Sequence, residues 1–328
     1  MRADDCVLGP DDYVLGPDDG VLGQRDVLEA PLRCVGAKAA TLARLAEGGV
    51  PVPAFYVVTA DAFASHLVRN KIAWPSPGDE ADREQWATMR ESIAASPMEE
   101  ALSGQILGAH ARVCSQSRHE RVAVRSSGSE EDSRSASFAG QFSSFLNLEG
   151  SEVLDAVKAC WASYLSERSR QYRAANRIPL GPAPSFSVIV QTQVLSERAG
   201  VIFTVHPLDP AGGELYIEAN FGTGESIVGG LVTPDRATVS RLGVVEMVTA
   251  TKRRMTQVSL ASRGTEVVEV EGPRRDAPVL SEGEVRELSR MGLRIEQLMD
   301  GPQDIEWAYD SRQLWILQAR PITTFAVG

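Results

Sequence analysis

Four polar side chains interrupt the apolar C-terminal stretch DIEWAYDSRQLWILQARPIT, residues 304–323. Asp304 and Glu306 precede a polar turn, and Gln318 and Arg320 follow it. Carboxylate and amide oxygens are hard ligands that suit Mg²⁺, and a guanidinium binds phosphate oxygens as a planar fork. The same spacing also allows a cross-strand salt bridge between an acidic residue and Arg320. The stretch therefore predicts either a metal and phosphate site or a structural ion pair.

The register of this predicted hairpin decides whether the four side chains can meet. Residues two apart on a strand share a face, so Asp304 lies with Glu306 and Gln318 with Arg320. The intervening apolar residues, expected on the other face, are Ile305, Trp307, Leu317 and Ala319. A loop of three or five residues would place Glu306 opposite Gln318, whereas a loop of two or four would separate them. We therefore expect a loop of odd length around Asp310, or a bulge that restores the register.

A second candidate is the small-residue segment VRSSGSEEDSRSASFAGQ. Arg125 ends a predicted strand there and opens a loop that reaches Gly140. Small residues let backbone N–H groups approach phosphate oxygens, which an arginine also binds. Because no Gly-Lys-Ser/Thr follows, the segment is not a P-loop, and a flexible surface loop is the alternative.

Lys38 is a third candidate, in the first turn of a helix predicted over residues 36–49. A phosphate at this helix start would be favoured by both the helix dipole and the lysine. An exposed lysine on a solvated helix face is the alternative. The glycines of FGTGESIVGG, residues 221–230, indicate a phosphate or ribose loop or a plain turn, since a GxGxxG pattern is absent.

Composition limits the partners. The chain has 328 residues, of which 43% are hydrophobic and 23% charged, and its net charge is −11. Nucleic acid and anionic membranes require basic surfaces, so neither is expected as the main partner. No apolar run approaches the roughly 18 residues of a membrane helix, and no signal peptide is apparent. Four cysteines and four histidines show no CxxC or metal-ligand spacing, which predicts reduced thiols in a cytoplasmic protein.

Three parts are expected along the chain. Residues 1–27 contain VLGPDDY, VLGPDDG and VLGQRDV, which are too short for a stacking unit and predict a tail whose third copy becomes a first strand. Residues 28–184 and 185–328 would form an N-terminal and a C-terminal lobe, divided at IPLGPAPS. A single amphipathic helix is expected over residues 151–176. Mixed helices and strands predict an α/β or α+β fold in two lobes.

The order of these segments resembles a known family, the N-terminal ATP-grasp nucleotide-binding domain of phosphoenolpyruvate synthase, pyruvate phosphate dikinase and rifampin phosphotransferase. The matching stretches are VGAKAATLARL, VPVPAFYVVTADAF, VAVRSSGSEEDSRSASFAGQFSSFLNL, IVQTQVLSERAGVIFTVHP, NFGTGESIVGGLVTPDR, TKRRMTQV and GPQDIEWAYDSRQLWILQARPIT. They cover about residues 30 to 324. The resemblance implies a two-lobed ATP-grasp fold with ATP bound between the lobes.

The resemblance also implies a role for each matching residue. Lys38, Arg125 and Arg320 would contact the ATP phosphates during transfer. A loop from Ser126 to Gln141, including Gly140, would close over the phosphates. The remaining implied nucleotide contacts are Gln191, Gln193 and Val194 at an adenine hinge, and Glu197 near the ribose. Glu306 and Gln318 would hold Mg²⁺, with support from Asp304.

Some features depart from the family pattern. Gly36-Ala37-Lys38 replaces a usual Gly-Gly-Lys, His206 occupies a position where an acidic or amide residue is common, and Phe221 replaces a common tryptophan. Relatives also carry a swivelling domain with a phosphorylatable histidine, and none of the four histidines here lies in such a segment. The expected phosphoryl acceptor is therefore a small molecule or a histidine on a separate partner protein.

The function implied by the resemblance is an ATP-dependent phosphotransferase of ATP-grasp type, which binds Mg-ATP and transfers a phosphoryl or pyrophosphoryl group. Two alternatives remain open. An ATP-grasp ligase would act through an acyl phosphate, although no residue selects for a carboxylate substrate. A non-catalytic module would bind ATP without chemistry, although it would not need the full set of charged candidates.

Overall fold

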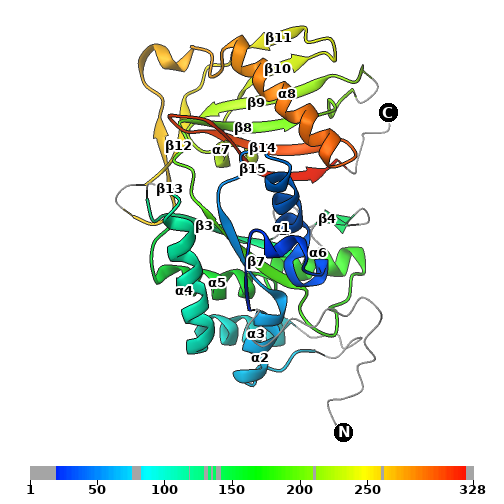
Figure 1. Cartoon of the computed structure of the whole chain (residues 1–328), viewed down its shortest axis with the longest axis vertical. Helices are drawn as coiled ribbons and strands as arrows, with labels where there is room; N and C mark the ends of the chain where they lie inside the picture. Colours follow the sequence, from blue (N-terminus) through cyan, green and yellow to red (C-terminus); the bar gives the residue numbers. More distant parts are fainter. Residues whose placement is uncertain are drawn as a thin grey trace.

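Two antiparallel sheets, one above the other in Figure 1, form the protein in this computed structural model. The structure describes residues 20–75, 83–117, 119–128, 142–209, 212–259 and 262–322, and the backbone of residues 132–133 and 136–137. Helices and strands share the chain throughout, so the expected α+β class is confirmed. The arrangement agrees with an ATP-grasp fold of two lobes.

The first sheet has five strands in the order β1-β2-β7-β3-β6. Their bounds are β1 Val21–Gly23, β2 Phe55–Val58, β3 Val122–Gly128, β6 Phe145–Leu148 and β7 Phe186–Thr192. Every residue of β2 and β7 is buried, as is typical of central strands covered on both faces. A separate small ladder joins β4 (Asp132–Ser133) to β5 (Ala136–Ser137).

Helices cover both faces of the first sheet. Their bounds are α1 Leu32–Glu47, α2 Ala60–Arg69, α3 Arg83–Ala95, α4 Glu100–Cys114, α5 Glu152–Ser163 and α6 Glu167–Asn176. Alternate residues of β2 reach opposite sides, because successive side chains of a strand alternate. Tyr56 and Val58 pack in the cluster that holds the apolar faces of α2 to α5, whereas Phe55 and Val57 pack with α1.

The second sheet has six strands in the order β11-β10-β9-β8-β14-β15. Their bounds are β8 Arg198–Phe203, β9 Leu215–Phe221, β10 Asp235–Val239, β11 Val245–Val248, β14 Gln303–Tyr309 and β15 Leu314–Pro321. Helix α8 (Glu282–Leu298) begins with a capping box between Ser281 and Glu284 and covers one face. Ile305, Trp307 and Tyr309 of β14 belong to that core, so the alternate residues of β14 face away from α8.

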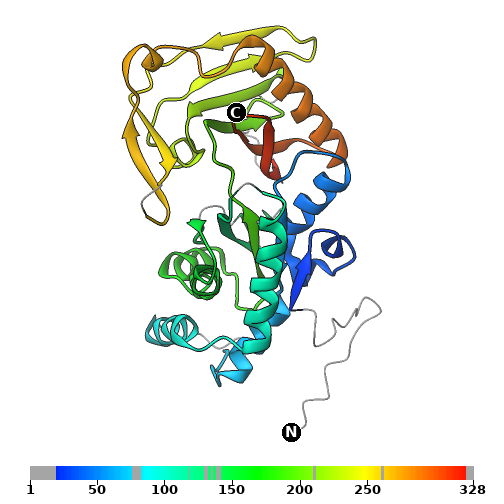
Figure 2. The ribbon, with the colours of Figure 1, turned by 60° about the vertical axis from the view of Figure 1, so that its left-hand side comes forward.

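A two-stranded hairpin, β12 (Arg254–Val258) and β13 (Thr265–Glu269), leaves the second sheet and descends toward the first, as Figure 2 shows. At its lower end the Gly264 amide donates to the Leu146 carbonyl at 3.1 Å. The short helix α7 (Glu225–Val228) follows β9. A further link between the lobes is the Ile316 amide, which donates to the Pro51 carbonyl at 2.8 Å.

Three expectations about chain organisation need correction. β7 follows the boundary expected at residue 185 but pairs with β2 and β3, so the chain changes sheets after Thr192. The first strand expected in the third repeat is confirmed as Val21–Gly23, but it pairs with β2 of the first sheet, so these residues do not belong to the tail expected over residues 1–27. The helix expected over residues 151–176 is divided into α5 and α6, because Ser166 caps a new helix by accepting from the Ser169 amide.

The first two repeat copies lie outside the described residues. Among the helices that the structure describes, none has the length and apolar character needed to span a membrane.

Candidate functional site

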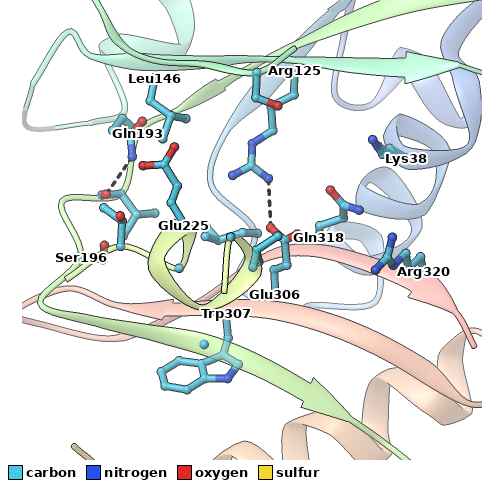
Figure 3. A pocket seen from close by; sticks show the side chains of 18 of the residues that line it. Lys38, Arg125, Leu146, Gln193, Ser196, Glu225, Glu306, Trp307, Gln318 and Arg320 are labelled. Atoms are coloured by element: carbon cyan, nitrogen blue, oxygen red, sulfur yellow. Dashed lines mark hydrogen bonds and ion pairs between the residues drawn. The ribbon is translucent and has the colours of Figure 1, made fainter. Parts of the chain in front are cut away.

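A cavity of about 580 Å³ lies where the two lobes meet. It is lined by Lys38, Arg125, Ser126, Phe142, Ser144, Leu146, Gln193, Val194, Ser196, Gly200, Thr223, Gly224, Glu225, Val228, Gly229, Glu306, Trp307, Leu317, Gln318 and Arg320. Figure 3 shows two ends: Lys38, Arg125, Gln318 and Arg320 gather at one, and Gln193, Ser196 and Glu225 at the other. The cavity therefore offers cationic groups at one end and uncharged polar groups with one carboxylate at the other.

The β14–β15 hairpin brings Glu306 opposite Gln318, as the sequence required for a shared site. Tyr309 pairs with Leu314, so the loop between them has four residues, an even number. A register shift between Glu306 and Trp307 restores the alignment, because Trp307 pairs with Ile316 and Glu306 with Gln318. The expected bulge is thus confirmed, on the β15 side at Leu317.

The bulge also corrects one expectation. Leu317 was expected to face the core, but it lines the cavity together with Gln318. An extra residue in a strand interrupts strict alternation, so two successive side chains can reach the same side. Asp310 closes the even loop by accepting from the Arg312 and Gln313 amides at 2.8 and 2.9 Å.

Asp304 forms an ion pair across the same hairpin. Its Oδ2 accepts from Arg320 Nε at 2.8 Å and from Nη2 at 2.7 Å. This is the cross-strand salt bridge that the sequence left open. Burial raises the pKa of the Asp304 carboxyl, and the Arg320 guanidinium opposes that shift. Arg320 lines the cavity, whereas Asp304 is not among the described residues that do.

Arg125 and Glu306 join the two lobes inside the cavity. Arg125 lies on β3 and Glu306 on β14, and Nη1 of the arginine donates to Oε2 of the glutamate at 3.4 Å, the contact drawn in Figure 3. Their side chains are 19% and 31% exposed, so the pair is only partly screened by water. Within the described residues, the buried Arg125 Nε has no hydrogen-bond partner. The arginine thus retains donor capacity for an anion.

Lys38 reaches the cavity because α1 is broken at Gly36. Gly36 has φ 75° and ψ 164°, so the regular helix restarts just before Lys38. The Ser127 hydroxyl donates to the Val35 carbonyl at 2.8 Å and accepts from the Ala39 amide at 3.1 Å. These two hydrogen bonds hold the restarted helix against β3, the strand that carries Arg125.

The predicted hinge residues divide between lining and support. Gln193 and Val194 line the cavity, and Gln193 Nε2 donates to the Val194 carbonyl at 3.1 Å. Gln193 Oε1 is buried and has no partner in the described part of the chain. Gln191 is buried inside the first sheet, between Phe55 and Ala123, and Glu197 is exposed; neither lines the cavity.

Gly140 and Gln141 lie outside the described residues. The site also contains residues that sequence reasoning did not single out, notably Thr223 and Glu225. Thr223 Oγ1 is buried and has no partner among the described atoms, and Glu225 Oε2 accepts from Thr265 at 2.6 Å. The glycine-rich segment 221–230 was the available signal, but it did not identify these side chains.

The donor set fits Mg²⁺ through Glu306 and Gln318. Both residues line the cavity from adjacent strands and supply carboxylate and amide oxygens, the hard ligands that Mg²⁺ takes alongside phosphate oxygens and water. The part of the chain that the structure describes contains no group of three or more His, Cys, Asp or Glu suited to a metal. A metal held by these two residues would complete its coordination with oxygens of a bound phosphate compound or with water.

Comparison with known proteins gives the class of this domain. Residues 32–327 match the family of the pyruvate phosphate dikinase AMP/ATP-binding domain. Because the match covers nearly the whole chain, the protein belongs to this family.

Among relatives, a probable phosphoenolpyruvate synthase of Methanocaldococcus jannaschii is 37% identical over 89% of this chain and 26% of its own length. A rifampicin phosphotransferase of Streptomyces sp. is 36% identical, over 92% of this chain and 35% of its own length. A phosphoenolpyruvate synthase of Aeropyrum pernix is 35% identical, over 90% of this chain and 41% of its own length. The chain thus spans well under half the length of each relative.

Among solved structures, the D-alanine-D-alanine ligase from Coxiella burnetii matches with a TM-score of 0.35 and 9% identity, over 87% of this chain and 47% of that chain.

Proposed function

We propose that this chain is an ATP-dependent phosphotransferase component of ATP-grasp type that binds Mg-ATP between its lobes. The observation that supports this best is the composition of one end of the cavity. Lys38, Arg125 and Arg320 bring three cationic side chains to a wall where Glu306 lies opposite Gln318. Phosphoryl transfer depends mainly on positioning and on neutralising phosphate charge, and these groups can do both.

Each group has a distinct role in the proposed site. Lys38, as a compact ammonium, would contact phosphate oxygens, and Arg320 would bind them as a fork. Arg125 would turn its donors from Glu306 to the nucleotide. Glu306 and Gln318 would hold Mg²⁺, which when bound neutralises phosphate charge and orients the transferred group. Arg125 and Glu306 would then give up their 3.4 Å ion pair, and each would gain a new partner of opposite charge, phosphate for the arginine and Mg²⁺ for the glutamate.

The end of the cavity opposite the cationic groups would receive the nucleoside. Gln193, Val194 and Leu146 provide a partly apolar surface there, and the unpartnered Gln193 Oε1 can accept from an amino group on a base. The Glu225 carboxylate lies at the same end and would contact the ribose, together with the Thr223 hydroxyl two residues before it in the chain. Ser126, which follows Arg125 on β3, also lines the cavity.

The acceptor is proposed in two forms, because the chain spans only part of its relatives. A histidine of a separate partner protein would attack the β-phosphate and take the pyrophosphoryl group with release of AMP, or a small molecule would take the γ-phosphoryl group with release of ADP. We also propose a cytoplasmic location.

The test combines nucleotide binding with product analysis. Wild-type protein is titrated with ATP in MgCl₂, then incubated with Mg-ATP and host extract fractions, and AMP is separated from ADP. Glu306→Gln is expected to abolish turnover, because a neutral amide replaces the anionic metal ligand. The matched control Glu246→Gln alters an exposed position on β11, at the far edge of the same sheet, and should behave as wild type. Binding that is absent in the wild type, or turnover unaffected by Glu306→Gln, would disprove the proposal.

If Mg-ATP binds but no fraction supports turnover, a non-catalytic ATP-binding module becomes the better description.

A further inference from the structure

Asp304 and Glu306 share a face of β14 but differ in their hydrogen bonds and in the exposed fraction of their side chains. Asp304 Oδ2 accepts two donors of one guanidinium at 2.8 and 2.7 Å, and the Asp304 side chain is 13% exposed. Glu306 accepts a single donor at 3.4 Å and is 31% exposed. The contact of Asp304 with Arg320 consists of two short hydrogen bonds, whereas the contact of Glu306 with Arg125 is a single long one. Of the two carboxylates, Glu306 is therefore the one that is readily released toward another ligand.

The placement of the two carboxylates differs as well. Glu306 and Gln318 both line the cavity. Arg320 also lines it, whereas its partner Asp304 is not among the described residues that do. A metal bound by Asp304 would lie beside the Arg320 guanidinium, and two positive charges at such close range repel each other. Asp304 therefore suits the support of Arg320 better than the coordination of a cation.

We propose that Asp304 is a positioning residue, which fixes the Arg320 guanidinium toward the phosphate end of the cavity, and that it is not a metal ligand. The role rests on the proposed function, because Arg320 is taken to bind phosphate. An arginine side chain loses considerable rotamer freedom when it binds an anion, and a partner that already holds it removes part of that cost. Loss of Asp304 should therefore weaken phosphate binding whether or not Mg²⁺ is present.

The experiment measures ATP binding by titration calorimetry at a series of MgCl₂ concentrations and in EDTA. We expect Asp304→Ala to raise the Kd for ATP about tenfold, equivalent to about 1.4 kcal/mol, by the same factor with Mg²⁺ and with EDTA. The Mg²⁺ concentration at half-maximal effect should not change. Arg320→Ala should have a similar effect, and the double variant should bind no more weakly than Arg320→Ala alone.

Two further variants control for failure to fold and for the loss of an arginine–carboxylate pair outside the cavity. Asp304→Asn preserves shape and one acceptor oxygen, so it should fold if Asp304→Ala does not and should raise the Kd by a smaller factor. Glu296→Ala removes the carboxylate of another arginine pair, Arg241–Glu296 at 3.1 Å, and should leave ATP binding unchanged because neither partner lines the cavity.

The outcomes separate this inference from the proposed function. A higher Mg²⁺ requirement in an Asp304 variant with normal binding in EDTA would make Asp304 a metal ligand and overturn the inference alone. Additive effects of Asp304→Ala and Arg320→Ala would also overturn it. Failure of the wild type to bind ATP under either condition would overturn the proposed function, and this inference with it.

Discussion

Replacing Gly36 with alanine tests the turn that brings Lys38 to the cavity. Gly36 has φ 75° and ψ 164°, a region that is essentially restricted to glycine. A Cβ added there would lie 1.9 Å from the Ser127 carbonyl oxygen and 2.5 Å from Ser127 Oγ. Ser127 lies two residues beyond Arg125 on β3, and its hydroxyl accepts from the Ala39 amide of the restarted helix. The substitution therefore strains the contact that sets Lys38 beside Arg125.

The expected loss has two parts. Holding a non-glycine residue in this backbone region costs about 1–3 kcal/mol. Moving β3 or α1 to relieve the overlap adds about 1–3 kcal/mol, the usual cost of overpacking a close-packed contact. Together they predict a decrease of about 2–6 kcal/mol in the free energy of unfolding, against a typical total of about 5–15 kcal/mol.

The assay is urea unfolding followed by tryptophan fluorescence, together with the Kd for Mg-ATP. Gly104→Ala is the matched control, because Gly104 lies within α4 and a Cβ there has nothing within 4 Å. It should stabilise the protein by about 0.5–1 kcal/mol, since alanine is the better helix former. If Gly36→Ala unfolded at the wild-type urea concentration and bound ATP normally, the close approach of α1 to β3 would be refuted.

Three further predictions concern stability. Asn147→Gly should lower the free energy of unfolding by about 1–3 kcal/mol in urea, because Asn147, at φ 62°, donates to the Ser259 and Ser262 carbonyls at 2.7 Å each; glycine accepts that φ, so an unchanged midpoint would mean that these bonds contribute nothing. Lys252→Met should cost about 3–5 kcal/mol in the same assay, because the fully buried ammonium lies 2.6 Å from Asp235; a stabilised variant would contradict this. Burial lowers the pKa of His66, so the unfolded chain binds the proton more readily and stability should fall as the pH drops below the usual value of 6.5; thermal melts between about pH 7 and pH 5 should show a smaller fall in His66→Asn.

The sequence predicted the features that depend on local pattern. Period-two alternation placed Asp304 and Glu306 on one face of a strand. The α6 start was missed although Ser166 is followed by an acidic residue, a common helix-start signal.

Features that depend on distant pairing could not be predicted in the same way. β7 belongs to the first sheet because it pairs with β2 and β3, and both of these strands lie far earlier in the chain. The bulge at Leu317 has no local signature, because it exists only relative to β14. The sequence showed that a shared site needs either a loop of odd length or a bulge. Only the structure showed that this hairpin has the bulge.

The links between the lobes suggest how a nucleotide would enter without separating them. Arg125 and Glu306, 181 residues apart, meet inside the cavity through one contact of 3.4 Å. Links that lie outside it include the Ile316 amide on the Pro51 carbonyl, and Asn147 on the hairpin carbonyls. Because these do not use cavity-lining side chains, Mg-ATP could replace the Arg125–Glu306 pair while they persist. Nucleotide binding is therefore expected to exchange one ion pair, with the lobes kept in register by contacts that the ligand never touches.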